Sequence, residues 1–159
     1  MVLLMGGCGR TPSGPEPATG PFIPRLLQGW TLESVSYEGY MPNPLDTTTQ
    51  AFFQGTASEC SGGFTFHTRN DSDLVLYDIE FQGELMAGLM PIHYKNSGEG
   101  IWQYDSLTSH LWFYAEPDTL NFYVDLDAET LQLWHSYAPI RDDSAGIDLT
   151  ARLDIRLIR

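Results

Sequence analysis

The C-terminal thirteen residues alternate between apolar and polar side chains more regularly than any other part of the chain. One parity holds Ile147, Leu149, Ala151, Leu153, Ile155 and Leu157, and the other holds Asp148, Thr150, Arg152, Asp154 and Arg156. A period of two with one apolar face is typical of a half-buried antiparallel β-strand. At roughly 3.3 Å per residue the strand would be about 43 Å long, a length that favours a strand curving around a barrel.

Shorter runs of the same kind occupy the chain from residue 29 onward. They are rich in Thr, Val, Tyr, Phe, Trp, Leu and Ile and are separated by Gly, Pro, Asn and Asp clusters, the pattern of strands and turns. We expect strands over residues 29–37, 51–57, 63–69, 74–82, 101–104, 110–115, 120–126, 131–136 and 147–159. Residues 41–44 (MPNP) are expected to break the chain, residues 97–100 to form a loop, and residues 84–91 to form the one short helix.

The strand spacing predicts an all-β domain built as an antiparallel meander. About eight to ten strands in hairpin succession would close as an up-and-down barrel, and a β-sandwich is the alternative. Closure is favoured because it removes edge strands, and the terminal strands near Trp30 and Ile155 can pair. The parity of the apolar residues changes between Leu32 and Val35, which predicts a bulge or bend in the first strand.

Charge excludes two classes of partner. The 159 residues hold 21 acidic and 8 basic side chains, a formal net charge of −13. Such a surface repels phosphate backbones and anionic lipid, so we expect neither nucleic-acid binding nor electrostatic docking on a membrane. The length fits one domain.

The first eight residues, MVLLMGGC, suggest where the protein resides. The arrangement of Leu4, Gly7 and Cys8 resembles the end of a bacterial lipoprotein signal peptide, which is cleaved before an acylated cysteine, although Met5 stands where leucine is usual. Residues 1–7 would then be a signal-peptide remnant and Cys8 the lipidated residue. The alternative is an ordinary chain start with a chance cysteine.

A proline-rich segment follows Cys8. Residues 9–24 contain five prolines and only two large apolar residues, Phe22 and Ile23. We therefore expect an extended tether over residues 8–28 and a folded domain over residues 29–159. The predicted location is the bacterial cell envelope, at the outer membrane and facing the periplasm or the exterior, with the membrane reached only through the lipid anchor.

Two segments carry a family resemblance. Residues 26–35 (LLQGWTLESV), with Gly29 and Trp30, look like the opening of lipocalin-like domains in lipoproteins of the Bacteroidota, and residues 149–157 are similar to the last strand of those domains. The resemblance implies a lipocalin-like β-barrel behind a lipidated cysteine. Most members have no assigned activity, so it implies a fold more than a function.

Catalytic motifs are absent from the sequence. The four histidines (His67, His93, His110 and His135) have no metal-ligand spacing, and there is no serine elbow, phosphate loop or dinucleotide fingerprint. Residues 70–73 and 125–129 space their oxygens as calcium loops do, but both also fall where hairpin turns are needed. We therefore expect a non-enzymatic protein without metal or cofactor. A hydrolase or isomerase using carboxylates and His110, which could approach His135, is the remaining enzymatic alternative.

The aromatic residues give the main functional hypothesis. Four Trp, eight Tyr and eight Phe exceed what a small core requires, and inward-facing aromatics can line the cavity of a barrel. We expect a small apolar or amphiphilic ligand at a barrel mouth lined by Phe66, Tyr77, Trp112, Tyr114 and Trp134. The alternative is a cell-surface module that docks a protein or a glycan through exposed aromatics. Residues 110–114 are apolar on both faces, so either face could be the cavity side.

Two further residues have structural predictions. Trp30, near the start of the first strand, is expected to plug the barrel floor. Cys60 has an adjacent acid and no nearby base, which predicts a structural or incidental thiol. A disulfide with Cys8 and a reactive thiol are the alternatives.

Overall fold

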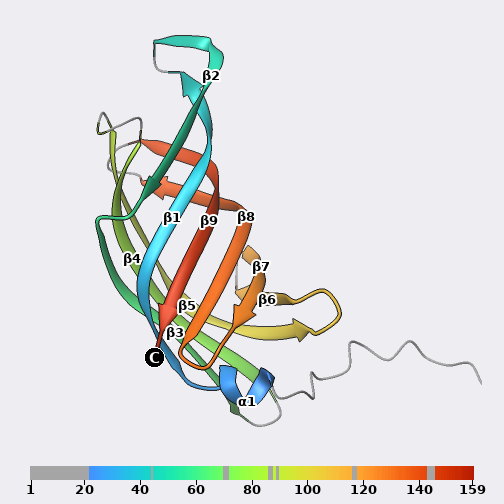
Figure 1. Ribbon diagram of the computed structural model, residues 1–159. Coiled ribbons are helices and arrows are strands. Elements are labelled where there is room, and N and C mark those ends of the chain that lie inside the picture. The colour runs from blue at the N-terminus through green and yellow to red at the C-terminus, as the bar shows by residue number, and fades with distance from the viewer. Residues whose placement is uncertain are drawn as a thin grey trace, which may run out of the picture.

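The computed structural model describes residues 22–43, 45–69, 72–85, 88, 90–115, 118–142 and 146–159 (Figure 1). The elements are α1 (Phe22–Leu26), β1 (Gly29–Asn43), β2 (Asp46–Thr56), β3 (Glu59–Arg69), β4 (Ser72–Leu85), β5 (Met90–Asp105), β6 (His110–Ala115), β7 (Asp118–Leu126), β8 (Thr130–Asp142) and β9 (Ile147–Ile158). Cys8, the predicted signal-peptide remnant and most of the predicted tether lie outside the described residues.

The strands form a closed antiparallel barrel. From β3 to β9 each strand pairs with the next in the chain, and the barrel closes because β1 pairs with both β3 and β9. Trp30 lies opposite Phe64 on β3, and Val35 lies opposite Ile155 on β9. Eight strands make the wall, and β2 is an additional strand. The all-β barrel is therefore confirmed, including the predicted pairing of the terminal strands.

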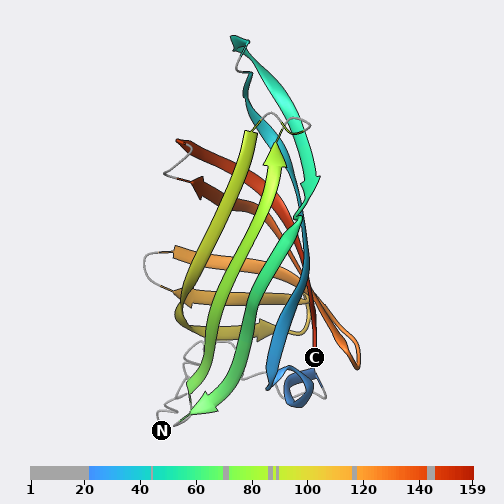
Figure 2. The same ribbon diagram turned by 90° about the vertical axis from the view of Figure 1, so that its left-hand side faces the viewer.

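The additional strand comes from a long β1–β2 hairpin. β2 pairs with the second half of β1, while β3 pairs with the first three residues of the same strand. The amide of Ala57 donates to the carbonyl of Val35 (2.8 Å) where the chain passes from β2 to β3. The hairpin projects beyond the barrel, at the end opposite α1 (Figures 1 and 2). The register of β1 on β9 shifts between Leu32 and Ser34, as the predicted bulge requires.

Three local predictions are wrong because strands are longer than expected. Residues 84–85 and 90–91 of the expected helix lie in strands: Leu85 ends β4, Met90 begins β5, and the two residues pair. Residues 97–100 lie within β5 rather than in a loop, and β1 continues to Asn43 through the expected break. Burying Leu85 and Ile92 against the core outweighs local helix propensity, because a helix this short is unstable alone.

The inward faces of the strands and helix α1 share one apolar core. At the barrel floor Trp30 is buried and its indole N–H donates to the carbonyl of Leu26 (3.1 Å), which is fully buried in α1. The ring of Phe22 stacks on Tyr104 at 4.0 Å between centroids. Trp30 and α1 together plug this end of the barrel, as the sequence predicts for Trp30.

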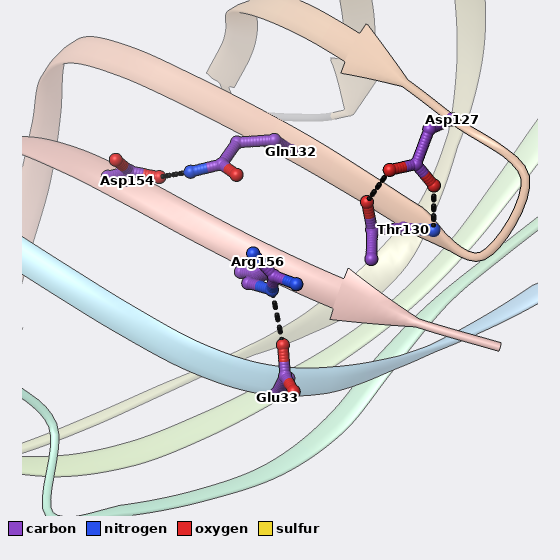
Figure 3. Close-up of polar contacts among 6 residues, drawn as sticks. All are labelled: Glu33, Asp127, Thr130, Gln132, Asp154 and Arg156. Carbon is purple, nitrogen blue, oxygen red and sulfur yellow. Dashed lines mark hydrogen bonds and ion pairs between the residues drawn. The ribbon is translucent and has the colours of Figure 1, made fainter.

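The outer wall at the barrel closure is polar (Figure 3). Glu33 on β1 forms an ion pair with Arg156 on β9, and Gln132 on β8 donates to Asp154 on β9. On β9, Asp154 and Arg156 have the parity opposite to the buried Leu153 and Leu157. The alternation of β9 therefore divides core from solvent, as the sequence predicts.

The acidic segment 125–129 contains a hairpin turn. Asp127 accepts hydrogen bonds from the amides of Glu129 (2.8 Å) and Thr130 (2.7 Å) and from the hydroxyl of Thr130 (2.7 Å; Figure 3). These bonds, led by the Glu129 amide, lower the pKa of the Asp127 carboxyl. Because local donors engage both of its oxygens, Asp127 is a turn residue rather than a free calcium ligand.

Candidate ligand-binding site

The barrel wall has a seam between β5 and β8, above the short β6–β7 hairpin. β5 pairs with β6 only over residues 101–105, and β8 pairs with β7 only over residues 131–134. Within the described residues, 90–100 of β5 and 135–142 of β8 have no backbone ladder on this side, although the two segments approach each other. The seam is therefore the part of the wall that backbone hydrogen bonds do not close.

The local sequence accounts for the seam. The dipeptide Glu116-Pro117 follows β6, and proline cannot donate a hydrogen bond to a continuing ladder. In β8 the register shifts between His135 and Ala138, and Pro139 follows at once. Proline within a sheet is confined to edge strands and bulges, so this half of β8 has the sequence of an edge.

Beneath the seam lies a cavity of about 320 Å³. This volume is at the lower end of the range for small-molecule sites. Its apolar lining comes from six strands: Phe64, Ile79, Phe81, Ala115, Leu120, Phe122, Ala138, Pro139, Leu153 and Ile155. The apolar alternation of β4, β7 and β9 therefore supplies most of the wall.

The polar lining is small and uncharged apart from one lysine. It consists of Tyr77, Tyr94, Asn96, Ser97 and His135, with Lys95. Although the chain holds 21 acidic residues, none of the described lining residues is Asp or Glu. The cavity therefore differs in electrostatic character from the rest of the surface.

Lys95 is held on the outer side of the seam. Its Nζ lies 3.0 Å from Oε2 of Glu80, whose Oε1 lies 2.7 Å from Nε2 of His93. The hydrogen bonds of Lys95 and His93 lower the pKa of the Glu80 carboxyl, and Lys95 has the larger effect. The one lysine of the chain is thus already paired with a carboxylate.

His135 is a half-buried polar residue of the cavity wall. It continues the inward parity of the buried Leu131 and Leu133, and its ring lies 5.3 Å from that of Phe122. Burial lowers the pKa of His135, and this outweighs a hydrogen bond to the backbone of Asn121, which acts in the opposite direction. Because this hydrogen bond raises the pKa, it favours the protonated ring. The ring N–H is therefore the donor and the backbone carbonyl of Asn121 is the acceptor.

Of the residues predicted to line the ligand site, only Tyr77 borders this cavity. Phe66 is inside the barrel but is packed in the core, with its ring 5.9 Å from Trp102 and 5.7 Å from Phe113. The other three, Trp112, Tyr114 and Trp134, have the parity opposite to the buried Leu111, Phe113 and Leu133, so they lie on the outer wall.

These outward residues belong to an aromatic surface over β6, β7 and β8. The ring of His110 lies 5.8 Å from Trp112 and 4.0 Å from Tyr123, which is half exposed. Tyr123 is opposite Trp134 in the ladder. His110 therefore faces outward and His135 inward, so the structure does not bring the two histidines to one site.

Most residues that line the cavity were not predicted from the sequence. His135 shares the parity of Leu131 and Leu133, and Phe122 shares that of Val124 and Leu126. Parity alone could have placed both side chains inside. Parity could not distinguish inward side chains that are packed in the core from inward side chains that border a cavity.

Cys60 has the features of a structural thiol. It is free and half-buried, and burial raises its pKa despite a hydrogen bond from the backbone of Val35. The thiolate is the nucleophile, so a raised pKa argues against the reactive alternative. Cys8, the partner in the disulfide alternative, is outside the described residues.

Comparison with known proteins adds no relative: no family model matches the chain, and no curated protein or solved structure is significantly similar to it. Among the described residues, no helix has the length and apolarity to cross a membrane.

Proposed function

We propose that the barrel binds a small apolar or amphiphilic ligand in the cavity beneath the β5–β8 seam, without catalysing a reaction. The observation that carries this proposal is the cavity of about 320 Å³, whose lining is mostly apolar. Apolar pockets with a few polar groups are the usual form of small-molecule sites. The seam gives a ligand a path that does not require breaking a backbone ladder.

A cavity-filling variant tests this proposal. Ala138 is buried and borders the cavity, so Ala138→Phe should occupy part of the volume and weaken binding of ethylbenzene at least tenfold in calorimetric titration. The matched control is Ala57→Phe, at a half-buried alanine that does not border the cavity. Binding that is equal in both variants, or absent from the wild type, would refute the cavity as a ligand site.

We further propose that Cys8 is acylated and holds the domain at the bacterial outer membrane, facing the periplasm or the exterior. The support is the sequence around Leu4, Gly7 and Cys8 and the proline-rich segment that follows. Palmitate labelling of the expressed chain should be lost in Cys8→Ser. A wild-type chain that takes up no label would end this proposal.

A second candidate function is docking of a protein or a glycan on the outer wall. The observation in its favour is that Trp112, Tyr114, Tyr123 and Trp134 share one outward face over three adjacent strands. Flat rings with an apolar body and a polar edge are suited to such contacts. Trp112→Ala combined with Tyr123→Ala should abolish retention on a glycan array while leaving ethylbenzene binding unchanged.

A further inference from the structure

We infer that the cavity selects an uncharged ligand that carries a hydroxyl group, an alcohol or a phenol, and that this hydroxyl donates a hydrogen bond to the imidazole of His135. This inference rests on the proposed function, since it names the chemical class of ligand for the same cavity. The basis of the inference is the charge and the hydrogen-bonding capacity of the residues that line the cavity.

A carboxylate ligand lacks a partner in this cavity. The one cation among the described lining residues is Lys95, and its ammonium is 3.0 Å from a carboxylate oxygen of Glu80. Burying an anion without a free counter-charge is strongly unfavourable. The net charge of −13 adds repulsion at longer range.

A cationic ligand meets the complementary difficulty. None of the described residues that line the cavity is an Asp or a Glu, so an ammonium group would be buried without a carboxylate. The acidic surface attracts cations at longer range, but no described residue of the lining supplies a carboxylate contact inside the cavity. The lining therefore disfavours both signs of charge and favours a neutral ligand.

His135 defines which neutral group fits. A neutral imidazole has one donor nitrogen and one acceptor nitrogen, and the ring of His135 borders the cavity with its centroid 5.3 Å from that of Phe122. The ring offers the cavity an acceptor, which a hydroxyl can satisfy and an ether or a hydrocarbon cannot. The lowered pKa of His135 supports this assignment, because it keeps the ring neutral at pH 7.

The size of the cavity limits the rest of the ligand. At roughly 30 Å³ for each water molecule of the liquid, the space holds about ten waters, so a ring with a short side chain fits. Phe122 borders the cavity next to His135 and offers an aromatic face to such a ring. Asn96, whose amide donates to the hydroxyl of Tyr94 (3.2 Å), adds a second polar group on β5.

Four probes of nearly the same size separate these possibilities. 4-Ethylphenol, ethylbenzene, 4-ethylbenzoate and 4-ethylbenzylamine are titrated into the full chain by calorimetry at pH 7.5. We expect 4-ethylphenol to bind about three- to tenfold more tightly than ethylbenzene, the effect of one hydrogen bond. The two charged probes should bind more weakly than ethylbenzene.

Two variants assign the preference to one side chain. His135→Phe should remove the advantage of 4-ethylphenol over ethylbenzene, while His135→Gln, which keeps an acceptor, should retain most of it. A cooperative thermal unfolding transition like that of the wild type reports an intact fold in His135→Phe. Should His135→Phe fail to fold, loss of the advantage in His135→Leu is the equivalent test.

The outcomes are distinct for the two proposals. If ethylbenzene binds but 4-ethylbenzoate or 4-ethylbenzylamine binds most tightly, the ligand class is wrong and the cavity remains a ligand site. If the phenol advantage persists in His135→Phe, His135 is not the partner of the hydroxyl, and the inference is overturned while the cavity remains a ligand site. If none of the four probes binds the wild-type chain, the proposed function fails and this inference fails with it.

Discussion

The barrel wall contains two junctions of opposite character, the β1–β9 closure and the β5–β8 seam. At the closure, backbone pairing continues along both strands, the inner face is buried and the outer face carries ion pairs such as Glu33–Arg156. At the seam, strand edges approach without a ladder in the described residues, and a cavity lies behind them. The comparison indicates that the chain fixes its topology at one junction and leaves access to its interior at the other.

The largest expected difference concerns two leucines, one at each junction. Leu157 is fully buried between Leu32 on β1 and Leu131 on β8, so Leu157→Ala should cost about 2–5 kcal/mol of the free energy of unfolding. Leu120 is half-buried at the cavity, where the space it leaves joins an existing void, so Leu120→Ala should cost about 1 kcal/mol. Urea denaturation measures both. Equal losses would mean that the seam is packed as tightly as the closure.

A smaller effect should appear in the pH dependence of stability. The pKa of His135 lies below its ordinary 6.5 in the folded protein, so the unfolded chain binds more protons as pH falls through this region. The contribution of His135 is complete above about pH 6.5 and declines as pH falls toward the lowered pKa. His135→Gln should flatten the decline between about pH 6.5 and pH 5 in thermal unfolding.

Three neighbouring or exposed groups with shifted pKa values act outside this window. The carboxylate of Glu80 raises the pKa of Lys95, which lines the same cavity, from its ordinary 10.5. Asp46 and Asp105 have pKa values lowered from 3.8 by hydrogen bonds from Thr48 and Thr108, so their contribution is lost only at lower pH. An unchanged slope in His135→Gln would show that the ring is not desolvated at the seam.

The smallest effect is expected for the ion pair at the closure. Glu33 and Arg156 are both substantially exposed, so a double-mutant cycle with Glu33→Gln and Arg156→Gln should give a coupling of about 0.2–1 kcal/mol. High salt should reduce it. A coupling as large as the loss in Leu157→Ala would mean that charge, rather than pairing and burial, holds this junction.

Local pattern predicted most of the wall because a strand with one buried face has a period that is visible in sequence. The alternation of residues 147–157, the bulge after Leu32 and the turn at Asp127 all depend on neighbours in the chain. Residues 84–85, 90–91 and 97–100 were predicted wrongly because their strand state depends on the pairing of β4 with β5 and on burial of Leu85 and Ile92. Those contacts are not local.

The ligand site likewise combines features that depend on neighbours in the chain with features that depend on non-local contacts. β6 is apolar on both faces, so Trp112 and Tyr114 could have faced either side, and packing against β5 and β7 turned Leu111 and Phe113 inward. The choice depends on which face meets the rest of the barrel, a property of the assembled sheet. The predicted mouth residues consequently fall mainly on the outer wall, and the cavity lining comes from all the strands from β3 to β9.

The sequence by itself determined that this chain forms strands, which side chains of β4 and β9 face the core, and that the net charge is −13. Periodicity and composition are local properties, and they survive whatever the strands pair with. Only the tertiary structure decided that β6 and β7 end too early to seal β5 against β8, and that His135 faces the resulting cavity. The extent of a ladder depends on two strands at once, and a void depends on all the strands around it.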